Sequence, residues 1–368
     1  MRILLAGGGS GGPVAPLIAV SEQIKKLQPK THFLLIGSHN GPEENMVRAA
    51  GLEFQAITTG KWRRYFSLQN LLAPFLVFYG FFQACSILKS FRPECVFGTG
   101  SFVQVPIIWA AWLFRIPCVV HQQDVYPSLA NKLCEFFVSR ITVSFEKSLT
   151  DFSSGLGLFY KKKQPEKVVL IGNPFREELR SKTRAQALGY FNLRPDMPVL
   201  LVLGGGTGSE FINKLILQAL PELSRVVQII HSQGNRGLNS PDCKNYFVYN
   251  FIDRMDYAYA AADIVLCRAG MSTLTELSNL GKLSIIIPLP DTHQEYNAFL
   301  MRQLKSALVF RQSEIYPQTL VRLIRKLLFD ANAQKLLTAN ISKIMPKNSA
   351  EKISRILLSE AKKERKYE

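Results

Sequence analysis

The sequence predicts an α/β protein built from two doubly wound parallel sheets, and three observations lead to this prediction. Short apolar runs alternate with stretches of helical spacing over residues 1–173, and the alternation restarts near residue 197. A glycine-rich loop follows the first apolar run of each half, at residues 7–12 and 204–209. The runs are nearly all apolar and rich in β-branched residues, which is typical of parallel strands covered on both faces.

These runs are the expected strands, and the segments between them are long enough for crossover helices. In the first half they lie at residues 2–6, 32–36, 94–97, 116–120, 140–144 and 168–171, and in the second half at residues 199–203, 226–230, 264–267 and 284–287. Pro174 follows the last strand of the first half and interrupts regular structure there. We therefore expect domains at residues 1–173 and 174–347, and a C-terminal helix within residues 348–368.

Composition limits the classes of function. The chain has 368 residues, of which 47% are hydrophobic and 20% charged, as expected of a globular protein. Its net charge of +17 favours acidic partners such as anionic lipids or phosphorylated molecules. No zinc-finger spacing, aromatic RNA-binding motif or helix-turn-helix pattern accompanies that charge, so we expect no nucleic-acid partner. Six cysteines without close pairs indicate free thiols, and the N-terminus has no signal-peptide pattern, so we expect a cytoplasmic protein.

Residues 61–91 form the most unusual segment. A basic and aromatic stretch at residues 61–66 precedes residues 68–88, which carry no charge and contain five aromatic side chains. Such a segment fits a surface that dips into anionic lipid, a buried core helix, or a membrane span. Pro74, Gly80 and several amide side chains weaken the third interpretation. We expect a membrane-surface patch, with a core helix as the alternative.

The first glycine loop, residues 7–12, satisfies the spacing of a dinucleotide-binding fingerprint. That fingerprint also requires an acidic residue at the end of the second strand, and residues 36–39 contain none. A dehydrogenase is therefore not expected. A glycine turn between a strand and a helix N-terminus still favours an anion, because the free N–H groups and the helix dipole both attract it. The second glycine loop, residues 204–209, has the same placement.

Three further polar clusters follow expected strands, at residues 121–132, 267–276 and 288–297. Ligands bind outside the carboxyl ends of the strands in such sheets, so these positions favour binding sites. Glu276 could accept hydrogen bonds from a vicinal diol, and the amides of Gln294 and Asn297 suit sugar hydroxyls. The alternative for residues 270–276 is a helix N-cap region with a solvated glutamate.

Taken in order along nearly the whole chain, these motifs resemble the MurG family, whose members transfer N-acetylglucosamine from UDP-GlcNAc to the lipid-linked muramyl-pentapeptide precursor of peptidoglycan. The resemblance also includes residues 60–64, 98–102 and 172–174. It implies a GT-B fold, with two Rossmann-like domains flanking an interdomain cleft and the last helix returning to the N-terminal domain. It implies an inverting transferase that converts lipid I to lipid II at the cytoplasmic face of the membrane, where residues 61–91 would contact anionic lipid, with no cofactor or metal.

By the family pattern, the N-terminal domain binds the acceptor and the membrane, and the C-terminal domain binds UDP-GlcNAc. The first glycine loop would hold the acceptor pyrophosphate, the second the donor diphosphate, and Glu276 the ribose. The implied substrate-binding residues are Ser10, Gly11, Gly12, Asp124, Asn131, Arg176, Gly206, Thr207, Gly208, Ile252, Arg268, Gly270, Met271, Ser272, Thr273, Glu276, Gln294, Glu295 and Asn297.

The chain departs from the family at positions that bear on catalysis. Pro13 stands where the family usually has a histidine that is a favoured general base, and proline has no titratable group. Gln122 replaces a usual glutamate, Asp124 a usual asparagine and Gly206 a usual serine. We therefore expect His121 or Asp124 to take the acceptor proton, with a loop-orienting role as the alternative for His121.

Two other functions remain open at this point. A non-catalytic relative that binds UDP-sugar or lipid would explain the loss of the usual base at Pro13. An enzyme resembling UDP-GlcNAc 2-epimerase would share the two Rossmann-like domains. The apolar and basic segment at residues 61–91 argues against an epimerase, because a soluble sugar nucleotide needs no membrane patch.

Overall fold

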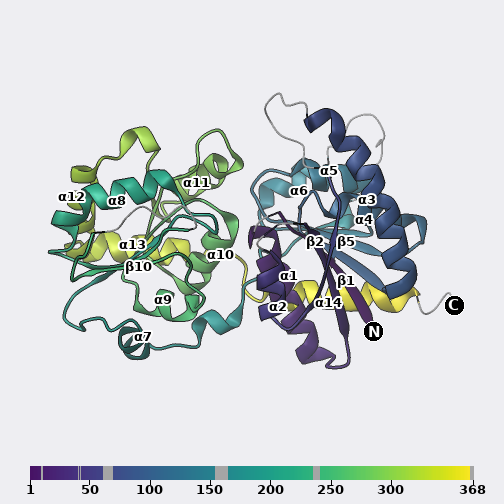
Figure 1. Ribbon diagram of the computed structural model, residues 1–368, viewed down its shortest axis with the longest axis horizontal. Helices are drawn as coiled ribbons and strands as arrows, with labels where there is room; N and C mark the ends of the chain where they lie inside the picture. Colours follow the sequence, from purple (N-terminus) through teal and green to yellow (C-terminus); the bar gives the residue numbers. More distant parts are fainter. Residues whose placement is uncertain are drawn as a thin grey trace. The chain divides into compact units, whose positions relative to one another are not determined.

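The computed structural model describes residues 1–9, 11–39, 41, 43–60, 69–153, 165–234 and 241–364. The chain divides into two compact units (Figure 1). Unit 1 comprises Met1–Arg176 and Pro346–Glu368, and unit 2 comprises Glu177–Met345. Each unit is an α/β domain around its own parallel sheet, so the fold class predicted from the sequence is confirmed.

Unit 1 contains a seven-stranded sheet in the order β3-β2-β1-β4-β5-β6-β7, and each pair of neighbouring strands is parallel. Its strands are β1 (Arg2–Ala6), β2 (His32–Ser38), β3 (Glu53–Ile57), β4 (Cys95–Gly98), β5 (Cys118–Gln122), β6 (Arg140–Val143) and β7 (Val168–Leu170). Its helices are α1 (Gly11–Leu27), α2 (Glu43–Ala49), α3 (Gln69–Phe91), α4 (Gln104–Leu113), α5 (Leu129–Cys134), η1 (Glu135–Phe137), α6 (Glu146–Ser153), η2 (Pro165–Lys167) and α14 (Ser349–Glu364).

Both faces of this sheet are buried, because alternate strand residues point to opposite sides. Leu4 and Ala6 of β1 pack with residues of α3, α4 and α5. Ile3 and Leu5 pack with residues of α1, α2 and α14. Helix α14 thus comes from the end of the chain to complete the core of unit 1, where it contacts α1 and β4 (Figure 1).

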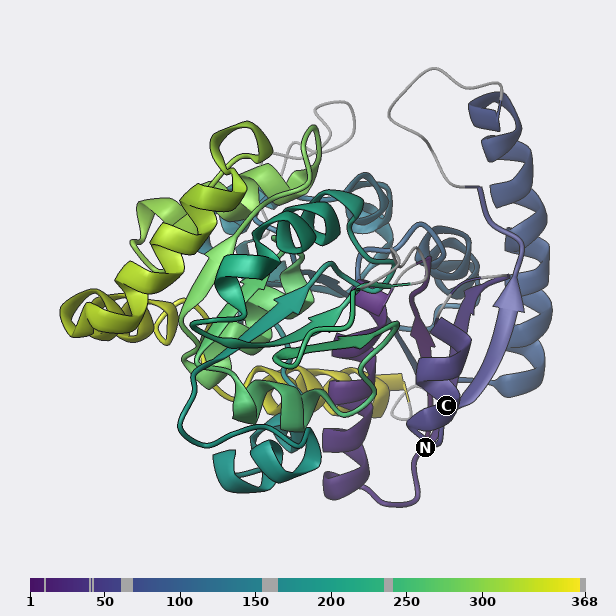
Figure 2. The same ribbon diagram turned by 60° about the vertical axis from the view of Figure 1, so that its left-hand side comes forward.

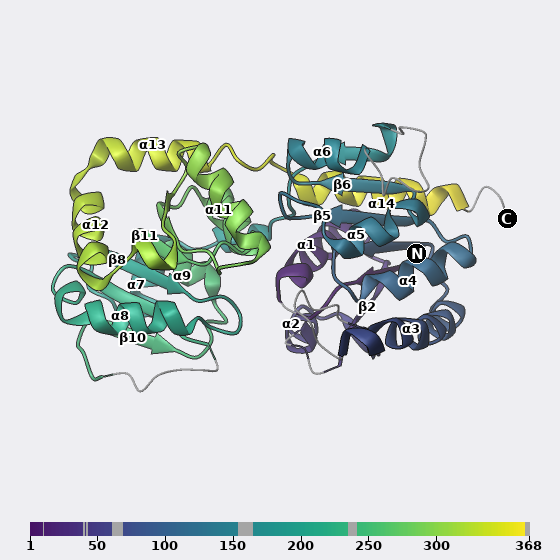
Figure 3. The same ribbon diagram turned by 90° about the horizontal axis from the view of Figure 1, so that it is seen from above.

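Unit 2 contains a six-stranded parallel sheet in the order β10-β9-β8-β11-β12-β13. Its strands are β8 (Val199–Leu203), β9 (Gln228–Ser232), β10 (Tyr246–Tyr249), β11 (Ile264–Cys267), β12 (Ser284–Ile286) and β13 (Leu308–Val309). Its helices are η3 (Glu177–Arg180), α7 (Arg184–Tyr190), α8 (Glu210–Leu223), α9 (Met255–Ala261), α10 (Met271–Leu280), α11 (His293–Gln303), η4 (Gln312–Glu314), α12 (Pro317–Phe329) and α13 (Ala331–Ile341). Figure 3 shows α12 beside α8, which it contacts, and α13 directly after it.

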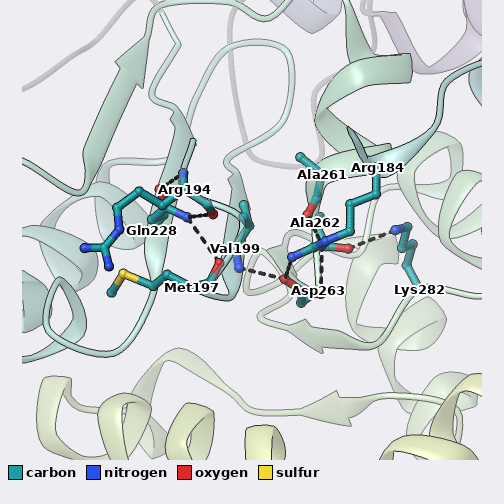
Figure 4. A network of polar contacts seen from close by, with 9 residues as sticks. All are labelled: Arg184, Arg194, Met197, Val199, Gln228, Ala261, Ala262, Asp263 and Lys282. Atoms are coloured by element: carbon teal, nitrogen blue, oxygen red, sulfur yellow. Dashed lines mark hydrogen bonds and ion pairs between the residues drawn. The ribbon is translucent and has the colours of Figure 1, made fainter. Parts of the chain in front are cut away.

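A polar network fastens the amino ends of the strands in unit 2 (Figure 4). The Asp263 carboxylate, which precedes β11, accepts from both Arg184 guanidinium nitrogens at 2.9 Å and from the Val199 N–H at 2.8 Å. The Gln228 side chain donates to the carbonyls of Arg194 and Met197. These contacts all lie at the amino ends of the strands.

Helix α3 is long and apolar enough, by length and composition, to cross a membrane, and 28% of its most apolar window is buried. It runs along the edge strand β3 (Figure 2) and packs against α4 through one face. The other face exposes large apolar side chains: Leu72, Phe75, Phe78, Tyr79 and Phe82. We call these five residues the aromatic face of α3. The basic residues at 61–66 lie outside the described residues.

All ten expected strands are present; β1, β8 and β11 have the expected bounds, and the other seven differ at one or both ends. Strands β5 and β9 begin two residues later than expected, so His121 and Gln122 lie inside a strand and not in the loop after it. Strands β3, β10 and β13 were not expected. All three strands are only partly buried: β3 alternates polar and apolar residues, and β10 and β13 are apolar runs of only four and two residues.

Candidate functional site

In unit 1, the loops after β1, β4 and β5 lie at the carboxyl ends of three adjacent strands. Chain order reverses between β1 and β4, which is where open α/β sheets bind ligands. Ser101, in the loop after β4, links its hydroxyl to both the N–H and the carbonyl of Gly8. Gln123, after β5, donates to the Thr99 carbonyl at 3.0 Å. The three loops therefore form one hydrogen-bonded rim.

A buried carboxylate holds the first glycine loop through hydrogen bonds to backbone N–H groups. Glu43, at the start of α2, is fully buried, and its Oε1 accepts from the N–H groups of Gly9 and Ser38, each at 2.9 Å. A Cβ added at Gly8 or Gly41 would overlap this carboxylate, so both glycines make room for it. Glu43 was not expected from the sequence, although an acidic residue in the first turn of a helix is a favourable placement.

Pro13 lies in the first turn of α1, where a proline is tolerated because the N–H it lacks would have no helical partner. Its carbonyl accepts from Thr99 Oγ1 at 2.6 Å. The helix consequently offers one N–H fewer at the loop. Gly11 and Gly12 open the same turn and are partly exposed, whereas Ser10 lies outside the described residues.

His121 is buried within β5 and bonded at both ring nitrogens. Its Nδ1 lies 2.9 Å from Thr142 Oγ1, and its Nε2 lies 2.9 Å from Asn173 Oδ1. Because Oδ1 only accepts, the proton sits on Nε2 and the threonine hydroxyl donates to Nδ1. Burial lowers the pKa of His121 to about 4, so the ring is neutral. The ring is therefore held between β6 and the residues after β7.

Asn131 and Asp124 belong to the segment after β5 but have different surroundings. Asn131 is fully buried, and its amide is bonded to Gln104, Gln122 and the His121 carbonyl. Its side chain therefore shapes the loop. Asp124 is partly exposed, and so is Arg176 at the end of the first part of unit 1. Asp124 is the carboxylate that the loop presents at this edge.

In unit 2, the loops after β8, β11 and β12 lie side by side at the carboxyl edge, and chain order again reverses between the first two of these strands. The second glycine loop follows β8. A Cβ added at Gly205 or Gly206 would meet no atom within 4 Å. Gly206 and Thr207 are exposed and Gly208 is partly exposed, so the loop backbone is open to a ligand.

Gly208 packs against the backbone of the residues that follow β9. It has φ +81° and lies against the carbonyl of Gln233 and against Gly234, which has φ +77°. His231 of β9, with Tyr246 and Asn213, supports this contact: Nδ1 lies 2.8 Å from the tyrosine hydroxyl and Nε2 3.1 Å from Asn213 Oδ1. Asn213 Nδ2 also donates to the Gln233 carbonyl at 3.1 Å. Burial lowers the pKa of His231 to about 4. This network was not predicted from the residue pattern.

Arg268 follows β11 and joins the neighbouring loops. It is buried and donates to the carbonyls of Ile287 and Pro288 and, at 2.7 Å, to Ser209 Oγ. Desolvation lowers the pKa of its guanidinium to about 10. Ser209 in turn caps α8 by accepting from the Ile212 N–H. Arg268 thus ties the second glycine loop to the loop after β12.

Helix α10 begins at this edge with the partly exposed Gly270 as its N-cap, and a Cβ there would meet no atom within 4 Å. Met271 is buried, while Ser272 and Thr273 are partly exposed in the first turn. Glu276 is partly exposed, and its Oε2 accepts from the hydroxyl of the buried Tyr259 at 2.6 Å. Ile252, after β10, is buried. The helix start therefore offers N–H groups and one oriented carboxylate.

The loop after β12 leads into α11, which Thr292 caps by accepting from the Gln294 N–H. Gln294 is partly exposed, and its Oε1 accepts from the Leu289 N–H. Glu295 is exposed, whereas Asn297 is fully buried and donates to the Ala269 carbonyl at 3.2 Å. Of the three side chains expected to bind substrate from this loop, Gln294 and Glu295 are therefore accessible to a ligand. Asn297 is buried and holds the loop that contains Ala269.

The chemistry available is anion binding and hydroxyl recognition. Two helices, α8 and α10, start at the carboxyl edge of unit 2 beside exposed glycine backbone, which suits a diphosphate. Glu276 suits a diol, and Gln294 and Glu295 suit sugar hydroxyls. Within the described ranges, no group of three or more His, Cys, Asp or Glu could hold a metal ion.

Two family models match the chain, one over most of the first sheet and one over the second. The model of the glycosyltransferase family 28 N-terminal domain matches residues 3–143, and that of the family 28 C-terminal domain matches residues 199–354. The chain is therefore a glycosyltransferase. The solved MurG of Acinetobacter baumannii has TM-score 0.67 and 23% identity over 97% of this chain and 99% of that one. A UDP-GlcNAc 2-epimerase from Neisseria meningitidis has TM-score 0.67 and 15% identity over 98% and 100%, so this likeness shows the shared GT-B fold alone.

Sequence relatives define the family more closely. The UDP-N-acetylglucosamine--N-acetylmuramyl-(pentapeptide) pyrophosphoryl-undecaprenol N-acetylglucosamine transferase of Halothermothrix orenii is 34% identical over 364 residues, covering 94% of this chain and 95% of that protein. The enzyme of the same name from Thermoanaerobacter sp. (strain X514) is 32% identical over 372 residues, covering 98% and 100%. The chain belongs to this family, the MurG transferases.

Proposed function

We propose that this chain transfers N-acetylglucosamine from UDP-GlcNAc, with inversion, to the lipid-linked muramyl-pentapeptide acceptor, which makes lipid II from lipid I. Its membership in the MurG family makes it a UDP-GlcNAc-dependent N-acetylglucosaminyltransferase. The observation that carries the proposal is the open edge of unit 2, where a Cβ added at Gly206 or Gly270 would meet no atom within 4 Å and the helices α8 and α10 begin close by in the chain.

We propose that unit 2 binds the donor. Gly206, Thr207 and Gly208 would hold the diphosphate through backbone N–H groups, and Glu276 would accept from the ribose hydroxyls. Gln294 and Glu295 would contact the sugar, because both are accessible at the next loop. As the bond between the anomeric carbon and UDP breaks, the fixed N–H dipoles stabilise the negative charge on the leaving diphosphate without reorganising.

We propose that unit 1 binds the acceptor and that Asp124 is the general base. Its carboxylate would take the proton of the acceptor hydroxyl while the oxygen bonds to the anomeric carbon. His121 is fully buried and hydrogen-bonded at both nitrogens, which supports a positioning role for it. Pro13 cannot accept a proton, so the first glycine loop would act by positioning the acceptor.

We also propose that the aromatic face of α3 contacts an anionic membrane surface, where a lipid-linked acceptor resides. Phe75 is 73% exposed and Phe78 is 64% exposed, and such a patch of large apolar side chains on one helix is unusual for a surface that faces only water. The net charge of +17 would favour anionic lipid. The enzyme would then act as a peripheral protein at the cytoplasmic face.

Turnover tests the function directly. The purified chain is incubated with UDP-GlcNAc and a short-chain lipid I analogue, and both UDP release and glycosylated lipid are measured. UDP release that requires the acceptor and matches product formation supports the proposal. Binding of UDP-GlcNAc without release would indicate a non-catalytic relative, and a change at the sugar C2 with UDP-GlcNAc alone would indicate an epimerase. Either result would overturn the proposal.

The membrane contact is tested by replacing Phe75, Phe78 and Phe82 with serine and sedimenting the protein with phosphatidylglycerol vesicles. We expect vesicle binding to fall at least about tenfold, because each buried phenylalanine is worth about 1.5–3 kcal/mol. Phe329→Ser in unit 2 is the matched control, since Phe329 is 89% exposed and lies on a different helix. Phe81 is left in place because it packs against the core. Unchanged sedimentation of the triple variant would refute the contact.

A further inference from the structure

The last residue of β5, Gln122, is 1% exposed and uses both ends of its amide. Its Nε2 donates to the carbonyls of Asp124 at 2.9 Å and Tyr126 at 2.7 Å. Its Oε1 accepts from the Ser128 N–H at 3.1 Å and from Asn131 Nδ2 at 2.7 Å. One side chain therefore fastens the whole turn from residue 124 to residue 128 to the end of the strand.

This set of partners requires an amide. The two loop carbonyls need a donor, and the Ser128 and Asn131 N–H groups need an acceptor. An ionised glutamate of the same shape only accepts, so it would place an oxygen against two carbonyl oxygens in a buried position. A buried acceptor that loses its donor costs free energy, and like partial charges at hydrogen-bond distance would push the turn away.

The orientation of the Gln122 amide is itself fixed by a chain of donors. The Gly100 N–H donates to Gln104 Oε1 at 2.8 Å, and Gln104 Nε2 donates to Asn131 Oδ1 at 2.6 Å. Asn131 Nδ2 then donates to Gln122, whose Nε2 points to the loop. Every bond runs in the same direction from the loop after β4 to the loop after β5, so each polarises the next.

We infer that Gln122 is a positioning residue that sets the Asp124 carboxylate for proton transfer from the acceptor hydroxyl. The inference rests on the proposed role of Asp124 as general base and goes beyond it by assigning what holds the base. The peptide that carries Asp124 has its carbonyl bound to the rigid end of β5, two residues away. A neutral amide does this without adding a second buried negative charge beside the base.

The test is a double-mutant cycle with Gln122→Glu and Asp124→Asn, with kcat and the KM for UDP-GlcNAc measured for each variant. We expect D124N to lower kcat by about 1,000-fold. We expect Q122E to lower kcat by about 100-fold, the effect of a misplacement near 1 Å, with the donor KM unchanged. In the D124N background, Q122E should cost less than about threefold, because there is no base left to misplace.

Gln123→Glu is the matched control, since Gln123 is also a buried glutamine but binds the Thr99 carbonyl. Its effect should multiply with that of D124N, as expected of an independent structural contact. If Q122E also multiplies with D124N, or leaves kcat unchanged, the positioning role is refuted while the base stands. If D124N keeps wild-type turnover, the base is refuted and the inference with it. If Q122E does not fold, Gln122→Met takes its place in the same cycle, because it removes the four hydrogen bonds without adding charge.

Discussion

The two glycine loops have the same local pattern, and they differ in what surrounds their glycines. In the first loop, a Cβ at Gly7 would lie 2.7 Å from Leu17 Cδ1 and one at Gly9 2.5 Å from Phe102 Cε1. In the second loop, a Cβ at Gly205 or Gly206 would meet open space. Gly7 and Gly9 of the first loop therefore permit internal packing, whereas Gly205 and Gly206 of the second leave room for a ligand. One sequence motif thus serves two physical purposes.

The largest effect should come from a series of substitutions in the second loop. Gly208→Ala combines a left-handed φ of +81° with overlap on the Gln233 carbonyl, so we expect a loss of about 4 kcal/mol of stability. Gly205→Ala has φ +91° and open space, so only strain remains, about 1–2 kcal/mol. Gly206→Ser has neither problem and should change stability by less than about 0.5 kcal/mol.

Urea denaturation of the three variants measures the series. Equal losses for Gly205→Ala and Gly208→Ala would show that backbone strain alone matters and that the overlap with the Gln233 carbonyl does not. The donor KM of Gly206→Ser provides a functional control, because a serine hydroxyl there can donate to a phosphate. A large rise in that KM would contradict an open diphosphate site at this loop.

In the first loop, the residue whose substitution should cost the most stability is Glu43, because its carboxylate holds the loop backbone. Glu43→Ala removes the acceptor for the N–H groups of Gly9 and Ser38, and buried donors without partners cost about 1–3 kcal/mol each. We expect a loss of about 3 kcal/mol in urea denaturation. All three tryptophans lie in unit 1, so tryptophan fluorescence reports the unfolding of that unit.

Glu44→Ala is the matched control, because Glu44 is the next residue of α2 and is exposed in a pair with Arg48. A surface pair of this kind is worth less than about 1 kcal/mol. If Glu43→Ala and Glu44→Ala lower stability equally, the carboxylate does not support the loop.

Acid should weaken both units through their buried histidines. His121 and His231 have their pKa values lowered to about 4, against about 6.5 in the unfolded chain. Between those values the unfolded chain binds protons that the folded chain does not, so stability falls as the pH drops from 6.5 to 4. The loss approaches about 3 kcal/mol per histidine.

Urea denaturation at a series of pH values from 7 to 4 tests this, with tryptophan fluorescence for unit 1 and circular dichroism for both units. His121→Gln should flatten the pH dependence of the fluorescence transition, and His231→Gln should leave that transition unchanged. His39→Gln is the control for an exposed histidine. A fluorescence transition whose pH dependence survives His121→Gln would show that another group controls the stability of unit 1.

Residue patterns predicted the layout of the fold because its central strands are apolar throughout. Every residue of β8 is buried, and such a run is visible in the sequence. Edge strands give a weaker signal, because β3 alternates polar and apolar residues over only five positions and β13 has only two residues. Strands that pack on one side only have a weaker hydrophobic pattern, so they are harder to predict from the sequence.

The candidate site was predictable in position but not in the burial of its side chains. The cluster at residues 288–297 follows β12, and those at residues 121–132 and 267–276 start with the last residues of β5 and β11 and continue into the loops at the carboxyl edges. Asn131, Arg268 and Asn297 were expected to bind substrate, and in the structure each is buried and bonded to its own chain. Amide and guanidinium groups suit sugars and loop carbonyls equally, so residue type could not separate the two roles.

The smallest predicted effect concerns Tyr259, which orients Glu276 in unit 2. Tyr259→Phe keeps the buried ring and removes the 2.6 Å hydrogen bond to the carboxylate. The hydrogen bond that orients the carboxylate contributes about 1 kcal/mol to the free energy of donor binding. Its loss should raise the KM for UDP-GlcNAc about fivefold and leave the acceptor KM unchanged. Tyr257→Phe on the same helix is the control, because that ring stacks on Tyr190 and not on the site. An acceptor KM that rises with Tyr259→Phe would contradict the assignment of the donor to unit 2, and with it the separate roles of the two glycine loops.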